Sequence, residues 1–539
     1  MALATTEMVV RGGMVADGTG GPLRRADVAI SGDRVVAVGQ VPSGGRPVVD
    51  AEGCVVAPGF INVLSHAYGT LQQDPRGLSD LYQGVTTEVF GEGISLGPVR
   101  GRLTDLLADE PREPGIRTAF PHLRDFLDHL QDSGVGPNVA SFVGAHNLRL
   151  IHAGADAREL TEAELAEACA LLDEELRAGA LGVGSALIYA PGNYASTAEL
   201  TAWARVLARH DALYISHIRD EGGRLLPAVE ELIGIARTTG ARAEIYHLKA
   251  AGRENWSTMA DAIDLVESAR ARGVPVTADM YPYEAGSTSL AACIPPLFHD
   301  GGRAALLQRL ADPTTRETIK RSIAEPASNW QNLYLDSGGA DGVLILGGVG
   351  PEVRGKTLAG VSRERGDHDP IDTLLDLVRQ EPDQMAAYFI VSERNIHLGL
   401  QRPWVSVCSD SEAPSAEAPF NETPTHPRAY GAFARTLGRY VRDGVLPLAE
   451  AVRRATSLPA ENLRLVGRGM IREGAFADLA IFDPVVFADC STYAEPHRYA
   501  VGMRHVLING AVVFTDGAPT GRLPGRALRR GGTADCPAR

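Results

Sequence analysis

FINVLSHAYG, residues 60–69, is the stretch from which the fold can be worked out. It is an apolar, strand-like run that ends in His66, and two positions before the histidine stands Leu64. Side chains alternate between the two faces of a strand, so residues 64 and 66 point the same way and could share a metal ion if both were ligands. Leucine cannot bind a metal, which leaves His66 as one half of a His-x-His pair.

Seven more short apolar runs follow this one, and Ala-, Leu- and Glu-rich segments of helical character lie between them. Strands that alternate with helices are typical of α/β proteins, and eight such units predict a (β/α)8 barrel. The gap before the last run is longer than one helix requires, so we expect an inserted subdomain at about residues 291–400. The eight runs are FINVLSH, TTEVFG, NVASFVG, GVGSAL, LYISHI, AEIYHL, VTADMY and WVSVCSD.

The two ends of the chain contain short β-rich pieces separated by Gly and Asp turn signals. Near the C-terminal end, in RHVLINGAVVFTDG, an Asn-Gly pair stands between two apolar runs, as in a hairpin turn. We expect both ends to build one small β-domain and the Gly-, Pro- and Arg-rich tail to be loosely ordered. The predicted boundaries are 1–59 plus 468–517 for the β-domain, 60–467 for the barrel and 518–539 for the tail.

Composition and charge argue against several classes of partner. The chain of 539 residues carries 52 Lys plus Arg against 67 Asp plus Glu, a formal net charge of -15 that repels nucleic-acid backbones and anionic membranes. No secretion signal or membrane-spanning run is recognisable, and the six cysteines have no paired spacing. We expect a cytoplasmic protein with free thiols and a small-molecule substrate; homo-oligomerisation stays open.

Polar and metal-competent side chains gather where the apolar runs end. Catalytic groups of (β/α)8 barrels lie at the C-terminal ends of the strands, so these residues are expected to meet at one rim. Each of them alone could equally be a cap or a surface residue, and it is their common position that predicts an active site. They are His66, Glu92, His217, His247, Tyr281, Tyr283 and Asp410.

A set of motifs spans nearly the whole chain: PGFINVLSH, QGVTTEVFGEGISLGP, SHIRDEG, IYHLKAAG, DMYPYEAGST, CSDSE, THPRAYGAFARTLGRYVRD and FADLAIFDP. In these motifs the chain resembles the amidohydrolase superfamily, and within it the D-aminoacylase (N-acyl-D-amino-acid deacylase) branch. The resemblance implies a metal-bearing barrel flanked by a small β-sandwich made from both termini. It also implies hydrolysis of the amide that joins an acyl group to an amino acid, with the D series favoured.

The resemblance places His217 and His247 on a tightly held zinc ion. The third ligand in this branch is usually a cysteine, and here Glu92 stands in its place. Two histidines and one carboxylate are a known catalytic zinc set that leaves a position open for water. We therefore expect a working site with one tightly bound Zn²⁺.

A second, looser metal position of the family would use residue 64, His66 and Asp410, and the leucine at position 64 is expected to empty it. The resemblance also implies that Asp410 is a metal-binding residue. With the second position empty, Asp410 is expected to take the proton of the attacking water and give it to the leaving nitrogen. His66 could hydrogen-bond the developing oxyanion, or it could be a packed histidine without a catalytic role.

Lys249 lies on the same strand face as the histidine two residues before it, and Tyr283 follows another tyrosine by the same step. With Arg428, these residues match family positions that hold the substrate carboxylate, for which cationic groups and a phenol are suited. A structural salt bridge of Lys249 or Arg428 with a nearby acid is the alternative. Tyr189 is a weaker candidate for the acyl pocket, and His146 is weaker still.

Two other functions stay open. Leu64 would suit a catalytically inactive homologue kept for binding or scaffolding, although the intact set of acidic and histidine side chains argues against it. A cyclic-amide hydrolase or a dipeptidase would use the same metal chemistry. The cyclic-amide relatives commonly use a carboxylated lysine as a bridging ligand, and we find no lysine at a fitting strand end. A dipeptide is itself an N-acyl amino acid.

Overall fold

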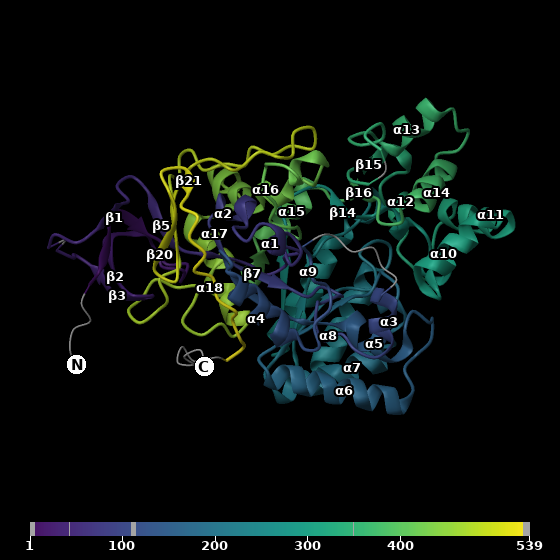
Figure 1. Ribbon diagram of the computed structural model, residues 1–539, viewed down its shortest axis with the longest axis horizontal. Coiled ribbons are helices and arrows are strands. Elements are labelled where there is room, and N and C mark those ends of the chain that lie inside the picture. The colour runs from purple at the N-terminus through teal and green to yellow at the C-terminus, as the bar shows by residue number, and fades with distance from the viewer. Residues whose placement is uncertain (1–5, 43, 109–114, 349, 532–539) are drawn as a thin grey trace.

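The computed structural model describes residues 6–42, 44–108, 115–348 and 350–531. Figure 1 shows a β-rich part at the left built from both ends of the chain, a barrel in the centre, and an outlying lobe, coloured teal to green, at the upper right. Within the described residues, no helix is long and apolar enough to span a bilayer.

Eight strand positions form the predicted barrel, and the third of them is split into two short pieces. Neighbouring strands pair in parallel. Every residue of the second, fourth and fifth strands is buried, as expected of parallel strands covered on both faces. In chain order the strands are β6 (Phe60–Asn62), β7 (Val85–Phe90), β8 (Asn138–Ser141) with β9 (Val143–Gly144), β10 (Gly182–Ala186), β11 (Leu213–His217), β12 (Arg242–Ile245), β13 (Val276–Met280) and β17 (Val405–Val407). The predicted (β/α)8 fold is confirmed.

The barrel closes between its first and last strands, just beyond their regular ends. Ser65 and Ser411 form a parallel bridge. The Asp410 amide donates to the carbonyl of Leu64, and the His66 amide donates to the carbonyl of Ser411, both at 2.9 Å. Closure of the barrel therefore sets His66 and Asp410 beside each other at the C-terminal rim.

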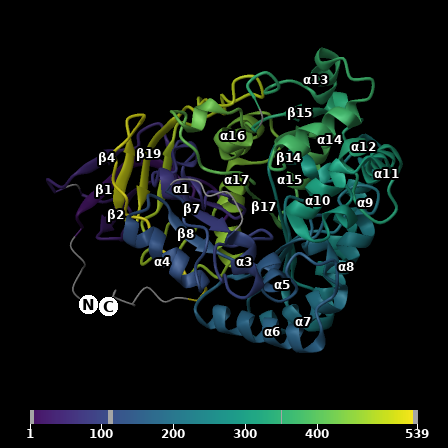
Figure 2. The same ribbon diagram turned by 45° about the vertical axis from the view of Figure 1, so that its right-hand side comes forward.

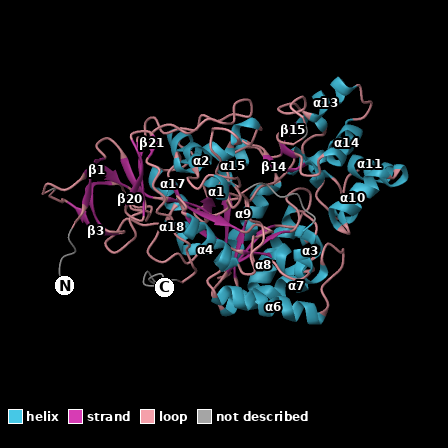
Figure 3. Cartoon of the chain, viewed as in Figure 1, coloured by secondary structure: helices cyan, strands magenta, loops and turns pink. Residues whose placement is uncertain are grey.

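Helices cover the barrel on the outside (Figure 3). In Figure 2 three of them, α6, α7 and α8, run along the lower edge, and consecutive members of this set pack against each other. The helices of the barrel are α1 (Thr70–Gln73), α2 (Leu78–Leu81), α3 (Arg102–Ala108), α4 (Leu123–Ser133), α5 (Ala145–Ala153), α6 (Glu162–Arg177), α7 (Thr197–Arg209), α8 (Leu225–Thr239), α9 (Thr258–Ala271), α15 (Glu393–Leu400), α16 (Arg428–Ala434), α17 (Leu448–Ala455) and α18 (Ser457–Asn462). A π-helical stretch, Arg435–Tyr440, continues α16.

Strands from both ends of the chain form one nine-stranded sheet with an apolar core of its own. The N-terminal and C-terminal halves of the sheet are joined where β18 pairs antiparallel with β5. The order is β21-β20-β19-β18-β5-β1-β2-β3, and β4 pairs with β1. The strands are β1 (Met8–Val15), β2 (Arg24–Ser31), β3 (Arg34–Gly39), β4 (Val48–Asp50), β5 (Val55–Pro58), β18 (Leu479–Phe482), β19 (Met503–Ile508), β20 (Ala511–Thr515) and β21 (Ala518–Pro519).

A lobe lies between β13 and β17, in the long gap of the sequence. Its described residues form an antiparallel sheet of order β14-β16-β15 and five α-helices, with short 3-10 turns between them. Its elements are β14 (Gly286–Ser289), α10 (Gly302–Ala311), α11 (Pro313–Ala324), α12 (Leu333–Asp336), β15 (Val343–Ile345), α13 (Leu358–Arg365), α14 (Pro370–Gln380) and β16 (Met385–Tyr388). The helix α15 then returns to the barrel, where it contacts α9, β13 and β17.

The tail differs from the expectation of a loosely ordered segment. Its first residues form β21, which pairs with β20. Further on, Ala527 bridges Val139 of the barrel strand β8, and the Leu528 amide donates to the carbonyl of Val139 at 2.8 Å. Arg526 and Arg529 form ion pairs with Asp33 and Asp128. Backbone pairing and these charges hold residues 518–531 in place, and residues 532–539 lie outside the described part of the chain.

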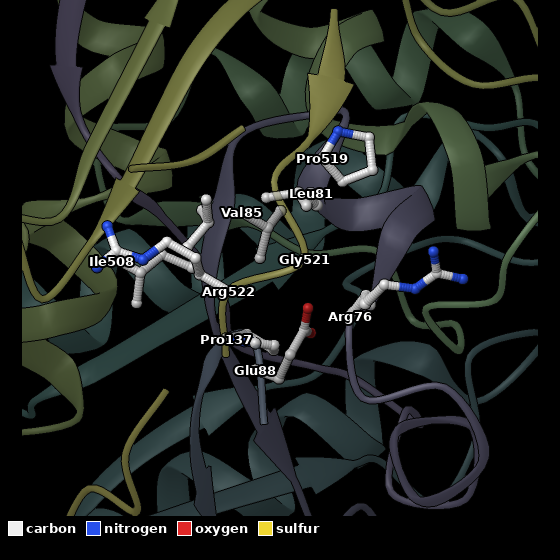
Figure 4. Close-up of a pocket in the computed structure, with 12 residues that line it drawn as sticks. Arg76, Leu81, Val85, Glu88, Pro137, Ile508, Pro519, Gly521 and Arg522 are labelled. Carbon is white, nitrogen blue, oxygen red and sulfur yellow. The ribbon is translucent and has the colours of Figure 1, made fainter. Parts of the chain in front are cut away.

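The tail also covers a small pocket at the N-terminal end of β7. Figure 4 shows the carboxylate of Glu88 pointing into this pocket, with Arg522 of the tail and Leu81 of α2 on its walls. Val85, the first residue of β7, is another lining residue. The pocket therefore lies at the opposite end of the strand from the residues that the sequence assigns to the active site.

We predict that a chain ending at residue 517 unfolds at a clearly lower temperature than the full chain. It loses β21 and the pairing of the tail with β8, and a backbone hydrogen bond is worth about 1 kcal/mol. Thermal unfolding followed by circular dichroism measures the difference. A chain ending at residue 531 keeps every contact described above and should unfold like the full chain. An unchanged unfolding temperature for the shorter chain would mean that the tail is loose after all.

Candidate active site

Glu92, His217 and His247 meet at the C-terminal rim of the barrel. The Oε1 atom of Glu92 lies 3.0 Å from Nδ1 of His217 and 3.2 Å from Nε2 of His247. The two imidazole rings are 4.4 Å apart between centroids and nearly perpendicular, at 85°. One donor atom from each of the three residues lies within 4.8 Å of the others, a spacing that a single metal ion can bridge. The structure thus brings together the three residues that the sequence assigned to the tight zinc ion.

The other oxygen of Glu92 faces a second group. Oε2 of Glu92 lies 3.2 Å from Nε2 of His66, which in turn lies 3.1 Å from Oδ1 of Asp410. These three residues also offer donor atoms within 4.8 Å of one another. The leucine at position 64 is buried in the main apolar core. The sequence predicted that this second position would be empty, yet three donors remain there without the missing histidine.

The backbone is strained at two of the five residues that make up the two donor groups. His247 has φ of 35° and Asp410 has φ of 51°, a region that costs a non-glycine residue about 1–3 kcal/mol. The His247 amide is held by a 2.8 Å hydrogen bond to Oδ1 of Asp279. Gly91, with φ of 109°, precedes Glu92, and a Cβ atom there would come within 2.4 Å of the Phe142 carbonyl oxygen.

The charge of the cluster fits a divalent cation. Three buried or nearly buried carboxylates stand against two cationic side chains, so negative charge is in excess when the histidines are neutral. Burial lowers the pKa of His66, but hydrogen bonds to Asp410 and Glu92 outweigh it and raise the value to about 9. His66 therefore holds a proton at neutral pH, and a metal ion bound by its ring would have to replace that proton. The charged side chains are Glu92, Glu221, Asp410, Lys249 and Arg428.

The carboxylate of Glu92 is strongly stabilised in its ionised form. Burial raises its pKa, but hydrogen bonds from His217, His247 and His66 hold the value well below the ordinary range. An ionised carboxylate beside two imidazoles is a donor set that zinc accepts readily.

Lys249 and Arg428 both have carboxylate partners inside the protein. Nζ of Lys249 lies 2.6 Å from Oε1 of Glu221, and Nη1 of Arg428 lies 2.6 Å from Oδ2 of Asp410. Both side chains are buried at the rim of the barrel. The salt bridges that formed the alternative interpretation are therefore present, and they hold both cations next to the cluster.

The predicted tyrosines separate into two environments. The ring of Tyr189 meets His217 edge to face, with centroids 5.3 Å apart. Tyr283 instead packs against His426, carries the guanidinium of Arg435 over its ring at 4.0 Å, and donates to Asp489 at 3.4 Å. None of these three contacts of Tyr283 involves a metal-competent residue, so the structure does not bring Tyr283 into the cluster.

Tyr281 occupies the place expected of Tyr283. Its ring centroid lies 6.2 Å from that of His247 and 4.7 Å from the guanidinium carbon of Arg428. The reason is local: β13 ends at Met280 and a proline follows Tyr281, so the strand alternation that linked the two tyrosines does not continue. His146 belongs to neither group of donors, and its Nε2 lies 3.0 Å from the Ala186 carbonyl oxygen.

The sequence did not single out Glu221, although this residue lies in the motif SHIRDEG. The residue is 3% exposed and lies beside both zinc-candidate histidines, 3.0 Å from Nδ1 of His247 and 3.4 Å from Nε2 of His217. Burial raises its pKa, but the charge of Lys249 and then those of His217 and His247 hold the value well below the ordinary range. Its position four residues after His217, in the same strand-end loop, was the available signal.

We predict that Glu92→Ala abolishes tight zinc binding, because this carboxylate is shared by both groups of donors. Zinc per chain, measured by elemental analysis after dialysis, should fall to background while the protein stays folded. Glu92→Cys is the matched control: a thiolate is a good zinc ligand, so this variant should keep its zinc. Retention of zinc by the alanine variant would contradict the assignment of Glu92.

Three comparisons bear on the identity of this site. The sequence model of the amidohydrolase family matches residues 418–514. D-aminoacylase from Alcaligenes xylosoxydans xylosoxydans is 33% identical over 527 residues, which are 97% of this chain and 98% of that protein. N-acyl-D-glutamate deacylase from Bordetella bronchiseptica, solved with zinc and a phosphonate inhibitor that mimics the tetrahedral intermediate of the reaction, is 32% identical with a TM-score of 0.79 over 97% of this chain and 100% of that one.

A further solved structure, of D-aminoacylase, concerns the functional role of a binuclear metal centre, with one-metal activation and second-metal attenuation. It is 32% identical, with a TM-score of 0.80, and the match covers 98% of this chain and 100% of that one. Identity at this level over nearly the full length of both chains shows common membership of one family. The chain belongs to the amidohydrolase superfamily, in its D-aminoacylase branch.

Proposed function

We propose that this protein is a zinc-dependent hydrolase that cleaves the amide bond of N-acyl-D-amino acids, releasing a carboxylate and a free amino acid. The observation that carries the proposal is the convergence of Glu92, His217 and His247, with Asp410 beside them. The activities in the names of the related proteins, D-aminoacylase and N-acyl-D-glutamate deacylase, support the same substrate class.

Glu92, His217 and His247 would hold the zinc ion, which when bound supplies Lewis acidity and lowers the pKa of water toward about 7. We infer one tightly bound ion, because this group has all its donors whereas the group of His66 and Asp410 lacks the residue that Leu64 replaces. The second group would bind a further ion more weakly.

Asp410 is the base that we assign to the reaction. Burial raises its pKa, but Arg428 and the hydrogen bond with His66 hold the value below the ordinary range, so the carboxylate is ionised and can accept a proton. In the proposed mechanism Asp410 takes the proton of the attacking water on a carboxylate oxygen and delivers it to the leaving nitrogen. This transfer lets the amine leave as a neutral group.

His66 is suited to hydrogen-bond the developing oxyanion. Its pKa of about 9 keeps the ring protonated at neutral pH, and its side chain is 30% exposed, so the ring can border a bound substrate. Nε2, which lies 3.1 Å from Asp410 and 3.2 Å from Glu92, would exchange one of these carboxylates for the substrate oxygen. A fully packed histidine would not show this exposure. We therefore favour the oxyanion role over that of a residual core residue.

Lys249 and Arg428 are assigned to the substrate carboxylate, with Tyr281 between them. The ring of Tyr281 lies 5.6 Å from Nζ of Lys249 and 4.7 Å from the guanidinium carbon of Arg428. A carboxylate on the substrate would compete with Glu221 and Asp410 for these two cations. Tyr189, which packs edge to face on His217, would border the acyl group.

We predict that the purified protein carries about one tightly bound zinc ion per chain and hydrolyses N-acyl-D-amino acids faster than the L enantiomers. Elemental analysis and release of free amino acid from paired D and L substrates are measured on one preparation. Two tight ions would contradict the stoichiometry. A hydantoin and a dipeptide are included, and preferred hydrolysis of either would favour the cyclic-amide or dipeptidase alternative. Zinc binding without turnover of any of them would favour an inactive homologue.

We predict that Asp410→Asn reduces kcat by roughly 10²- to 10⁴-fold, the usual contribution of general acid–base catalysis, while the tight zinc ion stays. Asparagine keeps the shape of the side chain and removes the basic oxygen. Parallel loss of zinc would identify Asp410 as an essential ligand, and an unchanged kcat would make it a cap of the barrel end. Thermal unfolding controls for the loss of the ion pair with Arg428.

A further inference from the structure

Glu221 lies on the far side of the two histidines from Glu92. For His247, Nε2 faces Glu92 at 3.2 Å and Nδ1 faces Oε1 of Glu221 at 3.0 Å. For His217, Nδ1 faces Glu92 at 3.0 Å, and Nε2 has Oε2 of Glu221 at 3.4 Å. Each imidazole thus has one carboxylate at each of its nitrogens.

The geometry points to Glu221 as a positioning residue of the metal site, which fixes the tautomer and the orientation of His247 when that residue binds the metal. The inference rests on the zinc site of the proposed function. A metal-ligating imidazole normally gives its second N–H to a carboxylate or carbonyl, and this contact keeps the lone pair of the other nitrogen on the metal. Here the carboxylate of Glu221 stands 3.0 Å from Nδ1 of His247, whereas its 3.4 Å contact with Nε2 of His217 is an ion-pair distance without a hydrogen bond.

Lys249 makes this role necessary. Its ammonium group lies 2.8 Å from Nδ1 of His247 and 2.6 Å from Oε1 of Glu221. An ammonium group only donates hydrogen bonds. Lys249 thus donates both to Glu221 and to Nδ1, and a Nδ1 that accepts puts the ring proton on Nε2, where it removes the lone pair that faces Glu92. A zinc ion on Nε2 would require the ring proton on Nδ1 instead, and the carboxylate of Glu221, 3.0 Å from Nδ1, is placed to accept from Nδ1–H in that state.

The inserted lobe fixes the loop that carries this carboxylate. The Glu221 amide donates to Oε1 of Gln331 at 2.9 Å, and Nε2 of Gln331 donates to Asp336 of α12 at 3.1 Å. On the barrel side, the Glu221 carbonyl accepts from the Ala251 amide at 2.7 Å. The loop is therefore held from both sides, and Glu221 is 3% exposed.

The test is a double-mutant cycle of Glu221→Gln and Lys249→Met, read out as zinc affinity by competition with a chelator. We expect Glu221→Gln to bind zinc about 10- to 100-fold more weakly, the usual effect of losing such a partner. Lys249→Met should bind zinc nearly as the wild type does. The double variant should recover part of the loss, because the competing ammonium group is gone. No recovery would overturn the role assigned to Lys249 and Glu221 together.

Visible absorption of the Co²⁺-substituted proteins separates a positioning residue from a ligand. Glu221→Gln should keep the coordination number of the wild type, and a changed one would make Glu221 a ligand and overturn the inference. Glu199→Gln is the matched control, because Glu199 is equally buried and pairs with Arg149 away from the cluster. Equal loss of zinc affinity in this control would ascribe the effect to general destabilisation and also overturn the inference.

If Glu221→Gln does not fold, the double variant is compared with Lys249→Met, since the double variant contains neither of the two buried charges. Equal zinc affinity of these two proteins would overturn the inference, and a several-fold weaker double variant would support it. A wild-type protein without tight zinc would instead refute the proposed function. Normal zinc binding by the wild type and by Glu221→Gln refutes only the role of Glu221.

Discussion

The two oxygens of the Glu92 carboxylate face two different groups, and the arrangement of the site depends on this division. Oε1 lies against His217 and His247, and Oε2 lies against His66. A cysteine thiolate at this position would carry the same single negative charge, but it would offer only one donor atom instead of two. The carboxylate therefore keeps the charge balance of a zinc site while it reaches both donor groups from a single strand end.

Closure of the barrel explains how residues so distant in sequence come to share that carboxylate. Backbone hydrogen bonds between the segments of Leu64 and Asp410 join the first and last strands of the barrel. They place His66, two residues after Leu64, beside Asp410. Leucine at position 64 does not disturb this closure, because its backbone carbonyl makes the bond and its side chain packs into the apolar core. A leucine in place of a metal-binding histidine at position 64 is thus compatible with an intact C-terminal rim of the barrel.

Much of the fold could be predicted because parallel barrel strands are buried on both faces and stand out as short apolar runs. The same regularity located Glu92, His217, His247 and Asp410, since each follows such a run. It gives no guidance where regular structure stops. Tyr283 was predicted from its two-residue step after Tyr281 and from its match to a family position, but β13 ends at Met280, and the structure places Tyr281 nearer to His247. The polar composition of the tail could not reveal that its backbone pairs with β8.

Glu221 could not be assigned from sequence for a different reason: its role depends on the direction of four side chains from three elements. The motif around it follows β11, its two partners His247 and Lys249 follow β12, and Gln331 comes from the inserted lobe. An excess of buried carboxylates around two imidazoles is stable only if each oxygen has a donor. Lys249 donates to the side chain of Glu221, and the side-chain oxygen of Gln331 accepts from the Glu221 backbone amide. The inserted lobe, remote in sequence, is therefore part of what holds the metal-binding face of the barrel.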